Sequence, residues 1–162
     1  MKTLLSLCTV LLLLVGCADD EKKALSEKFD KLQRQHDSIS QVHMTFKSTH
    51  GDMSEMHKNF TQKLATVEIQ DSTILEDVAK HEAILKKHDA MLNGHDKMIA
   101  AHKELRQGFG DKTAAQMEVQ LDEMIETHNK LVQEHNAMED EHDMMQKEHN
   151  AIMNKLERDS DN

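Results

Sequence analysis

From Leu25 onward, apolar residues recur at alternating steps of four and three residues. With Phe29 at heptad position a, an unbroken series of apolar residues occupies position d: Leu25, Leu32, Ile39, Phe46, Met53, Phe60 and Val67. A series this long exceeds the three or four heptads that indicate a coiled coil. Similar but wider apolar stripes follow in 81–105 and 121–156, and a wide stripe suits packing in a bundle. The pattern predicts an all-α fold, with 25–158 as a helical heptad-repeat domain.

Two places interrupt the pattern. The segment Gly108-Phe109-Gly110-Asp111 combines Gly, typical just beyond a helix end, with Asp, a good N-cap. A weaker interruption lies at 70–73, where Thr73 and Glu76 match a capping box. The favoured architecture is an elongated antiparallel bundle or coiled coil of three long helices, 21–70, 73–107 and 112–158. The alternative is one very long helix, 21–107, with 112–158 folded back on it. We expect residues 159–162 to fray.

Composition agrees with long helices. The 162-residue chain has no Pro, no Trp and no Tyr, and only five Gly, whereas 31% of its residues are charged. Scarce turn-forming residues argue against a fold of many strands. The net charge of −10 disfavours binding to nucleic acid.

The N-terminus carries an export pattern. Lys2 is followed by an apolar run that is too short to span a membrane, so 1–16 is expected to be a signal peptide. Its end, Leu14-Val15-Gly16-Cys17, resembles the lipobox of bacterial lipoproteins. The resemblance implies cleavage before Cys17 and acylation of that residue, followed by an acidic tether over 17–24. It also implies a lipid-anchored protein of the bacterial cell envelope, at the outer membrane, on its periplasmic face or at the cell surface.

The twelve His residues form a regular lattice. They fall into three sets of four, and neighbours within each set are seven residues apart. The sets are His36, His43, His50 and His57; His81, His88, His95 and His102; and His128, His135, His142 and His149. Seven residues of helix span about 10.5 Å. Because metal–nitrogen bonds are about 2.0–2.1 Å, one ion cannot bridge two of these His on one helix. A metal site must therefore use Met or join different helices.

Met residues alternate with many of these His at helical spacing. His-x-x-Met and Met-x-x-His steps resemble, locally, the motifs of periplasmic silver- and copper-binding proteins. Thioether and imidazole together suit a soft ion, so the resemblance implies Cu(I) or Ag(I), with Zn²⁺ less favoured. In an antiparallel pair of helices, we expect layers that set His of one helix against Met of another. The candidate ligands are His50, Met53, His57, His88, Met91, His95, Met98, His102, Met124, His128, His135, Met138, His142, Met145 and His149.

A purely structural role for the lattice is favoured over metal binding at this stage. Met often fills a helical core, and a polar residue at a repeated seam position can fix register. Protonation of several seam His near pH 6 is expected to loosen the packing. The sequence shows no phosphate loop or catalytic constellation, so we predict a protein that is not an enzyme. The first functional hypothesis is a membrane-anchored spacer, scaffold or partner-binding module, with the seam joining a second copy or another protein. The alternative is binding or buffering of a soft metal.

Overall fold

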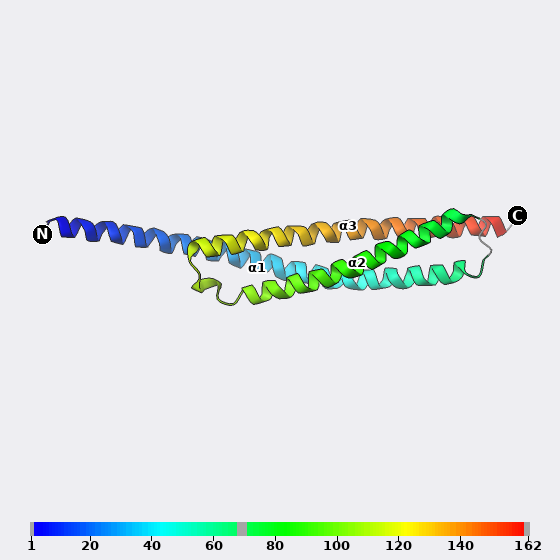
Figure 1. The fold of residues 1–162 in the computed structure, drawn as a ribbon, viewed down its shortest axis with the longest axis horizontal. Helices are drawn as coiled ribbons and strands as arrows, with labels where there is room; N and C mark the ends of the chain where they lie inside the picture. The colour runs from blue at the N-terminus through cyan, green and yellow to red at the C-terminus, as the bar shows by residue number, and fades with distance from the viewer. Residues whose placement is uncertain (1, 68–70, 161–162) are drawn as a thin grey trace. The chain divides into compact units, whose positions relative to one another are not determined.

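The computed structural model of the protein describes residues 2–67 and 71–160, with side chains described for 19–67 and 71–158. Three α-helices make up most of it: α1 (Lys2–Leu64), α2 (Ser72–Leu105) and α3 (Ala114–Ser160). A short 3₁₀ turn, η1 (Phe109–Asp111), lies between α2 and α3 (Figure 1). No strand occurs in the described ranges. The predicted all-α fold with three long helices is confirmed, and the alternative helix over 21–107 is wrong.

The first break comes earlier than the sequence pattern predicts. α1 ends at Leu64, and the next residues turn through bonds such as that from the Val67 N–H to the Leu64 carbonyl. Asp71, rather than Thr73, caps α2, because its carboxylate accepts bonds from the Thr73 N–H at 3.0 Å and the Thr73 hydroxyl at 2.7 Å. Lys155 of α3 adds an ion pair to the same carboxylate.

The second break lies where Gly108 predicts it, but its cap differs. Gly108 has φ 79, a left-handed conformation that glycine adopts without strain. Asp111, the expected N-cap, belongs to η1 instead. α3 begins after Thr113, whose hydroxyl accepts the Gln116 N–H while the Gln116 side chain accepts the Thr113 N–H. This reciprocal pair is a capping box, so Thr113 is the N-cap.

The chain forms two compact units, each taken here by itself. The first comprises Met1–Ile39 and Met98–Lys130, and the second Ser40–Lys97 and Leu131–Asn162. In the first unit, the rings of Phe29 and Phe109 stack with centroids 3.7 Å apart. That pair belongs to one apolar cluster drawn from α1, η1 and α3: Leu25, Phe29, Leu32, Phe109, Met117, Leu121 and Met124.

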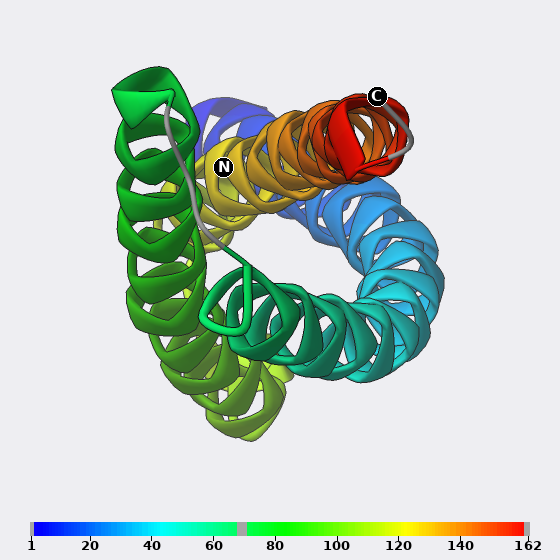
Figure 2. The same ribbon diagram turned by 90° about the vertical axis from the view of Figure 1, so that its right-hand side faces the viewer.

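In the second unit, three apolar clusters combine residues from all three helices. They are Phe46, Leu92 and Met138; Met53, Leu85 and Met145; and Phe60, Leu64, Ile74 and Ile152. Numbers rise along α1 and α3 while they fall along α2, so within this unit α2 runs antiparallel to the other two. Figure 2 views this unit from the end where α1 stops and α2 begins, with the three helices around a common interior. On α1, the d positions Phe46, Met53 and Phe60 each supply one of these clusters, whereas Val67 of the same series is 45% exposed.

Some predictions fall where side chains are not described. The signal peptide 1–16, the lipidation residue Cys17 and the tail 159–162 all belong to this part of the chain. Within the described residues, no helix combines the length and apolarity needed to cross a membrane.

Candidate metal centres

The His lattice becomes four layers, each with one His from every helix. The heptad spacing keeps each set of four on the inner face of its helix, and the three sets meet in the interior. The donor nitrogens of each layer lie within 4.8 Å of one another. The first unit contains the layer His36, His102 and His128, and the second unit contains three layers: His43, His95 and His135; His50, His88 and His142; and His57, His81 and His149.

The same ring atoms meet in every layer. The Nδ1 atoms of the α1 and α2 His both face Nε2 of the α3 His, at distances of 3.0–3.3 Å. Three nitrogens that bind one tetrahedral ion at 2.0–2.1 Å lie about 3.3–3.4 Å apart. Two of the three nitrogen separations in each layer are therefore close to those that a bound ion requires, and the third, between the Nδ1 atoms of α1 and α2, is within 4.8 Å.

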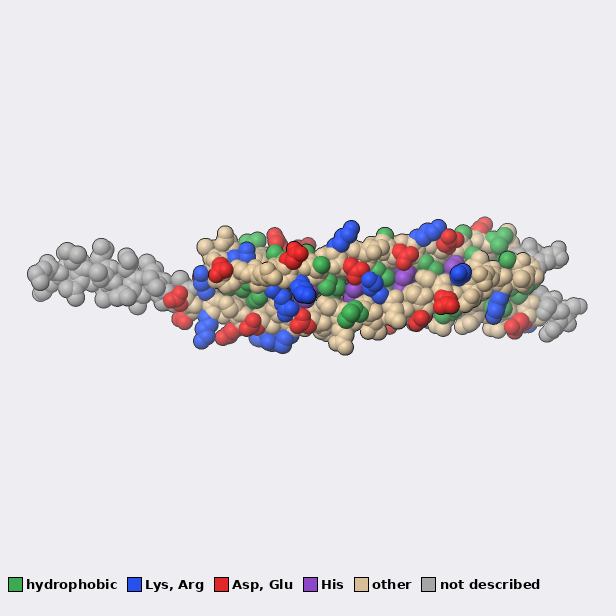
Figure 3. Space-filling view, turned by 90° about the horizontal axis from the view of Figure 1, so that it is seen from below, with side chains coloured by type: hydrophobic (Ala, Val, Ile, Leu, Met, Phe, Trp, Pro, Cys, Tyr) green, Lys and Arg blue, Asp and Glu red, His purple; other side chains and the backbone are tan. Residues whose placement is uncertain are grey.

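All twelve His are buried, with exposed fractions between 0% for His88 and 6% for His57 and His102. Only small patches of His surface show among the charged side chains on the face drawn in Figure 3. Buried polar groups need partners, so these rings must be satisfied by one another, by nearby side chains or by an ion.

Carboxylates bind the outer nitrogens of several rings. A carboxylate only accepts hydrogen bonds, so the Nε2 atom beside it must carry the proton and Nδ1 of a neutral ring keeps its lone pair. In the layer of His50 and His88, both rings donate outward, and two lone pairs consequently point at His142. The donor–carboxylate pairs are His43–Asp96, His50–Asp89, His81–Glu148, His88–Glu141 and His95–Glu134.

This arrangement matches the second shell of metal sites, where a ligating His donates its other N–H to a carboxylate. Lysines extend two of the networks: Lys47 pairs with Asp96 at 2.7 Å and Lys87 with Glu141 at 2.8 Å. These cations hold the carboxylates in their ionised form, and the pKa values of Asp96 and Glu141 are lowered.

Burial keeps the central His neutral. Desolvation, followed by repulsion from the other His of the layer, lowers the pKa of the four α3 His to about 4: His128, His135, His142 and His149. Desolvation is also the first cause of the lowered pKa of His36, His43, His57, His88 and His102. Neutral imidazole is the form that binds a metal, so these nine His are ready to coordinate at neutral pH.

Most of the Met candidates lie in apolar layers between the His layers. Met138 packs with Phe46 and Leu92, while Met53 and Met145 pack with Leu85. Met124 belongs to the apolar cluster of the first unit, Met91 packs partly against the cluster of Met138, and Met98 is half-buried. The prediction that His of one helix meets Met of another is wrong, because the His of the three helices meet one another in the same layer.

Three members of the layers are absent from the candidate ligands of the sequence: His36, His43 and His81. None of them has a Met three or four residues away, so the His and Met motif does not include them. The unbroken spacing of seven was the better guide, since it includes them with the other nine.

Three fully buried ring nitrogens of the described layers have no hydrogen-bond partner. The Nδ1 atoms of His128, His142 and His149 are buried without a hydrogen bond. They lie on the α3 rings, whose Nε2 atoms occupy the layer centres. The residue His149 also lines a groove at the surface.

Comparison with known proteins assigns no family, because no family model matches the chain and no curated protein or solved structure is similar to it.

Proposed function

We propose that this protein binds transition-metal ions in its interior, up to one ion in each His layer, and serves as a metal-binding or metal-buffering protein. The observation that supports this is the convergence of three buried imidazole nitrogens, one from each helix, in four layers. Outer carboxylates strengthen the case, because they fix the ring tautomer that presents a lone pair to the centre.

The donor set favours Zn²⁺ over the soft ions that the Met pattern suggests. Imidazole suits borderline ions such as Zn²⁺, and three His ligands with an open fourth position are an established zinc arrangement. Met53, Met138 and Met145 pack in apolar clusters, which leaves imidazole as the shared donor of the layers. Cu(I) and Ag(I) remain the comparison ions for the test.

The resemblance of residues 14–17 to a lipobox supports the further proposal that this activity belongs to the bacterial envelope. Acylation at Cys17 would anchor the chain to a membrane, and two or more acyl chains hold a protein stably there. On this proposal the protein is not an enzyme, and it keeps a store of metal ions at the membrane surface.

A structural role as a spacer or scaffold is the second candidate, and one observation favours it. Each α3 Nε2 lies 3.0–3.3 Å from two Nδ1 atoms, so a single Nε2–H can be shared between two lone pairs with no metal present. Such a network can fix helix register as buried polar residues do.

A titration of the purified protein with Zn²⁺, in competition with a chromophoric chelator, separates the two candidates. Metal binding predicts up to four Zn²⁺ per chain and a melting temperature that rises with free Zn²⁺ through linkage. The same titration with Cu(I) and Ag(I) should show weaker binding. No uptake at micromolar Zn²⁺, with an unchanged melting temperature, would leave the structural role.

A layer replacement supplies the matched control. The triple variant H50L/H88L/H142L exchanges one buried polar layer for an apolar one, so it should stay folded and gain stability without metal. Its Zn²⁺ stoichiometry should fall by one. An unchanged stoichiometry would show that the ions bind elsewhere.

A further inference from the structure

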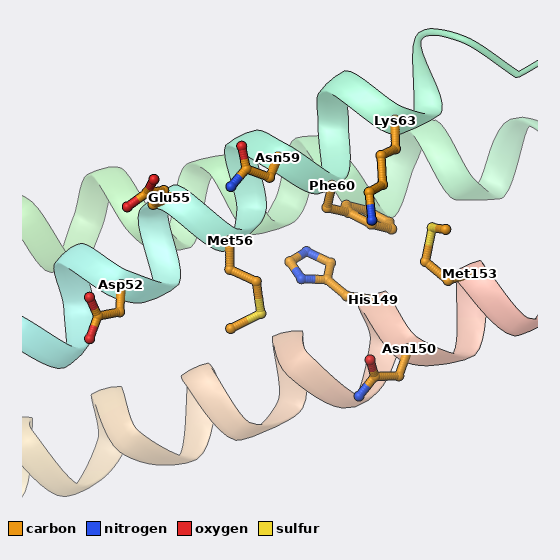
Figure 4. A pocket seen from close by; sticks show the side chains of 9 residues that line it. All are labelled: Asp52, Glu55, Met56, Asn59, Phe60, Lys63, His149, Asn150 and Met153. Atoms are coloured by element: carbon orange, nitrogen blue, oxygen red, sulfur yellow. The ribbon is translucent and has the colours of Figure 1, made fainter.

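One His layer of the second unit lies beside an open groove. The groove has a volume of about 420 Å³ and runs between α1 and α3. Its α3 wall contains His149 of the layer His57, His81 and His149, and Figure 4 shows the His149 ring between the side chains of Met56 and Met153.

The His149 ring that lines the groove holds a buried nitrogen without a hydrogen-bond partner. Nε2 of His149 lies 3.1 Å from Nδ1 of His57 and 3.1 Å from Nδ1 of His81, so it is engaged in the layer. Nδ1 of the same ring has no partner, although His149 is only 4% exposed. When the proton of this neutral ring is on Nε2, Nδ1 carries a lone pair that can bind a cation.

Carboxylates lie along the other wall of the groove, which α1 forms. Asp52 and Glu55 of α1 are exposed and three residues apart, so they lie on one face of the helix with Met56 and Asn59. Lys63 is the one cation among the groove residues, and Figure 4 shows it near Phe60, away from Asp52. The end of the groove at Asp52 and Glu55 therefore attracts a hydrated cation, while His149 offers it a first nitrogen ligand.

We propose that this groove is an entry port for the metal, in which Asp52 and Glu55 attract a divalent ion and His149 passes it into its layer. The inference rests on the proposed function. Nδ1 of His149 would hold the ion first, and a turn of the ring would bring this nitrogen to the Nδ1 atoms of His57 and His81 while the protonated Nε2 leaves the layer centre. This layer consequently fills before the others of its unit.

The test is the rate of Co²⁺ or Zn²⁺ loading, followed by stopped-flow on the whole protein. The variant D52N/E55Q should load about three- to tenfold more slowly at low salt, because the carboxylates raise the local concentration of the cation. Its equilibrium affinity and stoichiometry should equal those of the unchanged chain. The loading rate of the unchanged chain should also fall with ionic strength more steeply than that of the variant.

The matched control is E27Q/D30N, which removes two exposed carboxylates with the same spacing from α1 in the other unit. It should load at the unchanged rate. A second variant, N150K, adds a positive charge to the groove and should slow loading as well. Imidazole NMR signals at a substoichiometric dose of Zn²⁺ should change first in His57, His81 and His149.

The outcomes separate the port from the function. If the unchanged chain binds no metal, the proposed function fails and the port fails with it. If it binds metal but D52N/E55Q and E27Q/D30N load at the same rate, or another layer fills first, the port is wrong and the function stands.

Discussion

At the scale of the residue, the central feature is that the two nitrogens of one imidazole ring have different roles. In the layer of His50, His88 and His142, two rings give Nε2–H to carboxylates and turn Nδ1 inward. The outer carboxylate therefore decides which nitrogen carries the proton, and the inward Nδ1 keeps its lone pair. It also raises the basicity of the ring and so strengthens a metal bond.

The hydrogen bond from His88 to the Glu141 carboxylate predicts the effect of Glu141→Gln. The Glu141 carboxylate accepts from both His88 and Lys87, and the amide lacks the charge that holds the His88 proton. One of the Zn²⁺ sites should weaken by about 10–100-fold, measured by chelator competition. Exposed Glu139 provides the control, because E139Q makes the same change of charge two residues away. Identical isotherms for the two variants would remove Glu141 from the site.

At the scale of the element, the glycines show how local conformation controls the helices. Gly108 adopts φ 79 between α2 and η1, whereas Gly51 lies inside α1 with open space around the position of a Cβ. The first needs glycine, because a left-handed conformation strains other residues. The second weakens its helix, because glycine loses more backbone entropy than alanine.

Substitution of these two glycines by alanine should have opposite effects. G108A should lower the free energy of unfolding by about 1–2 kcal/mol, the cost of the left-handed conformation. G51A should raise it by up to about 1 kcal/mol, because alanine is the better helix former. Urea denaturation of each variant measures both changes. Equal signs would mean that the turn at Gly108 relaxes or that Gly51 has a role beyond helix propensity.

The elements also show how far the sequence pattern reaches. Three helices were predictable, because the four-three rhythm and Gly108 are local features. The end of α1 at Leu64 was missed by six residues, since the rhythm continues past the turn. The N-caps at Asp71 and Thr113 were not predictable, because several nearby Thr and Asp residues are equally good N-cap candidates by type. Only the side-chain geometry in the fold selects between them.

The layers needed information that periodicity on one helix does not contain. Spacing of seven puts each His on an inner face, but the register between helices decides what it meets. The structure pairs α1 and α3 His at a constant separation of 92 residues, as in His43 with His135. Antiparallel alignment of the four His of α1 with the four His of α2 predicts the same layers. The His and Met motif instead predicts layers of His against Met.

At the scale of the whole molecule, the layers link folding to pH. The α3 His have a pKa of about 4 in the folded chain, below the ordinary value of 6.5. Between these values the unfolded chain binds more protons than the folded one, so acid favours unfolding. Each such group contributes a slope of about 1.4 kcal/mol per pH unit. The loosening expected near pH 6 from the sequence therefore begins there and grows toward pH 4.

The metal-free protein should consequently keep a constant free energy of unfolding above pH 7 and lose stability steadily from about pH 6.5 to 4. The lowered pKa values of Asp96 and Glu141 act in the same direction, since their contribution disappears as those carboxylates are protonated at still lower pH. Urea denaturation at a series of pH values measures the slope. The variant H50L/H88L/H142L has one titrating layer fewer, so its slope should be shallower. A slope equal to that of the unchanged chain would show that the buried His do not control the acid response, and that exposed groups do.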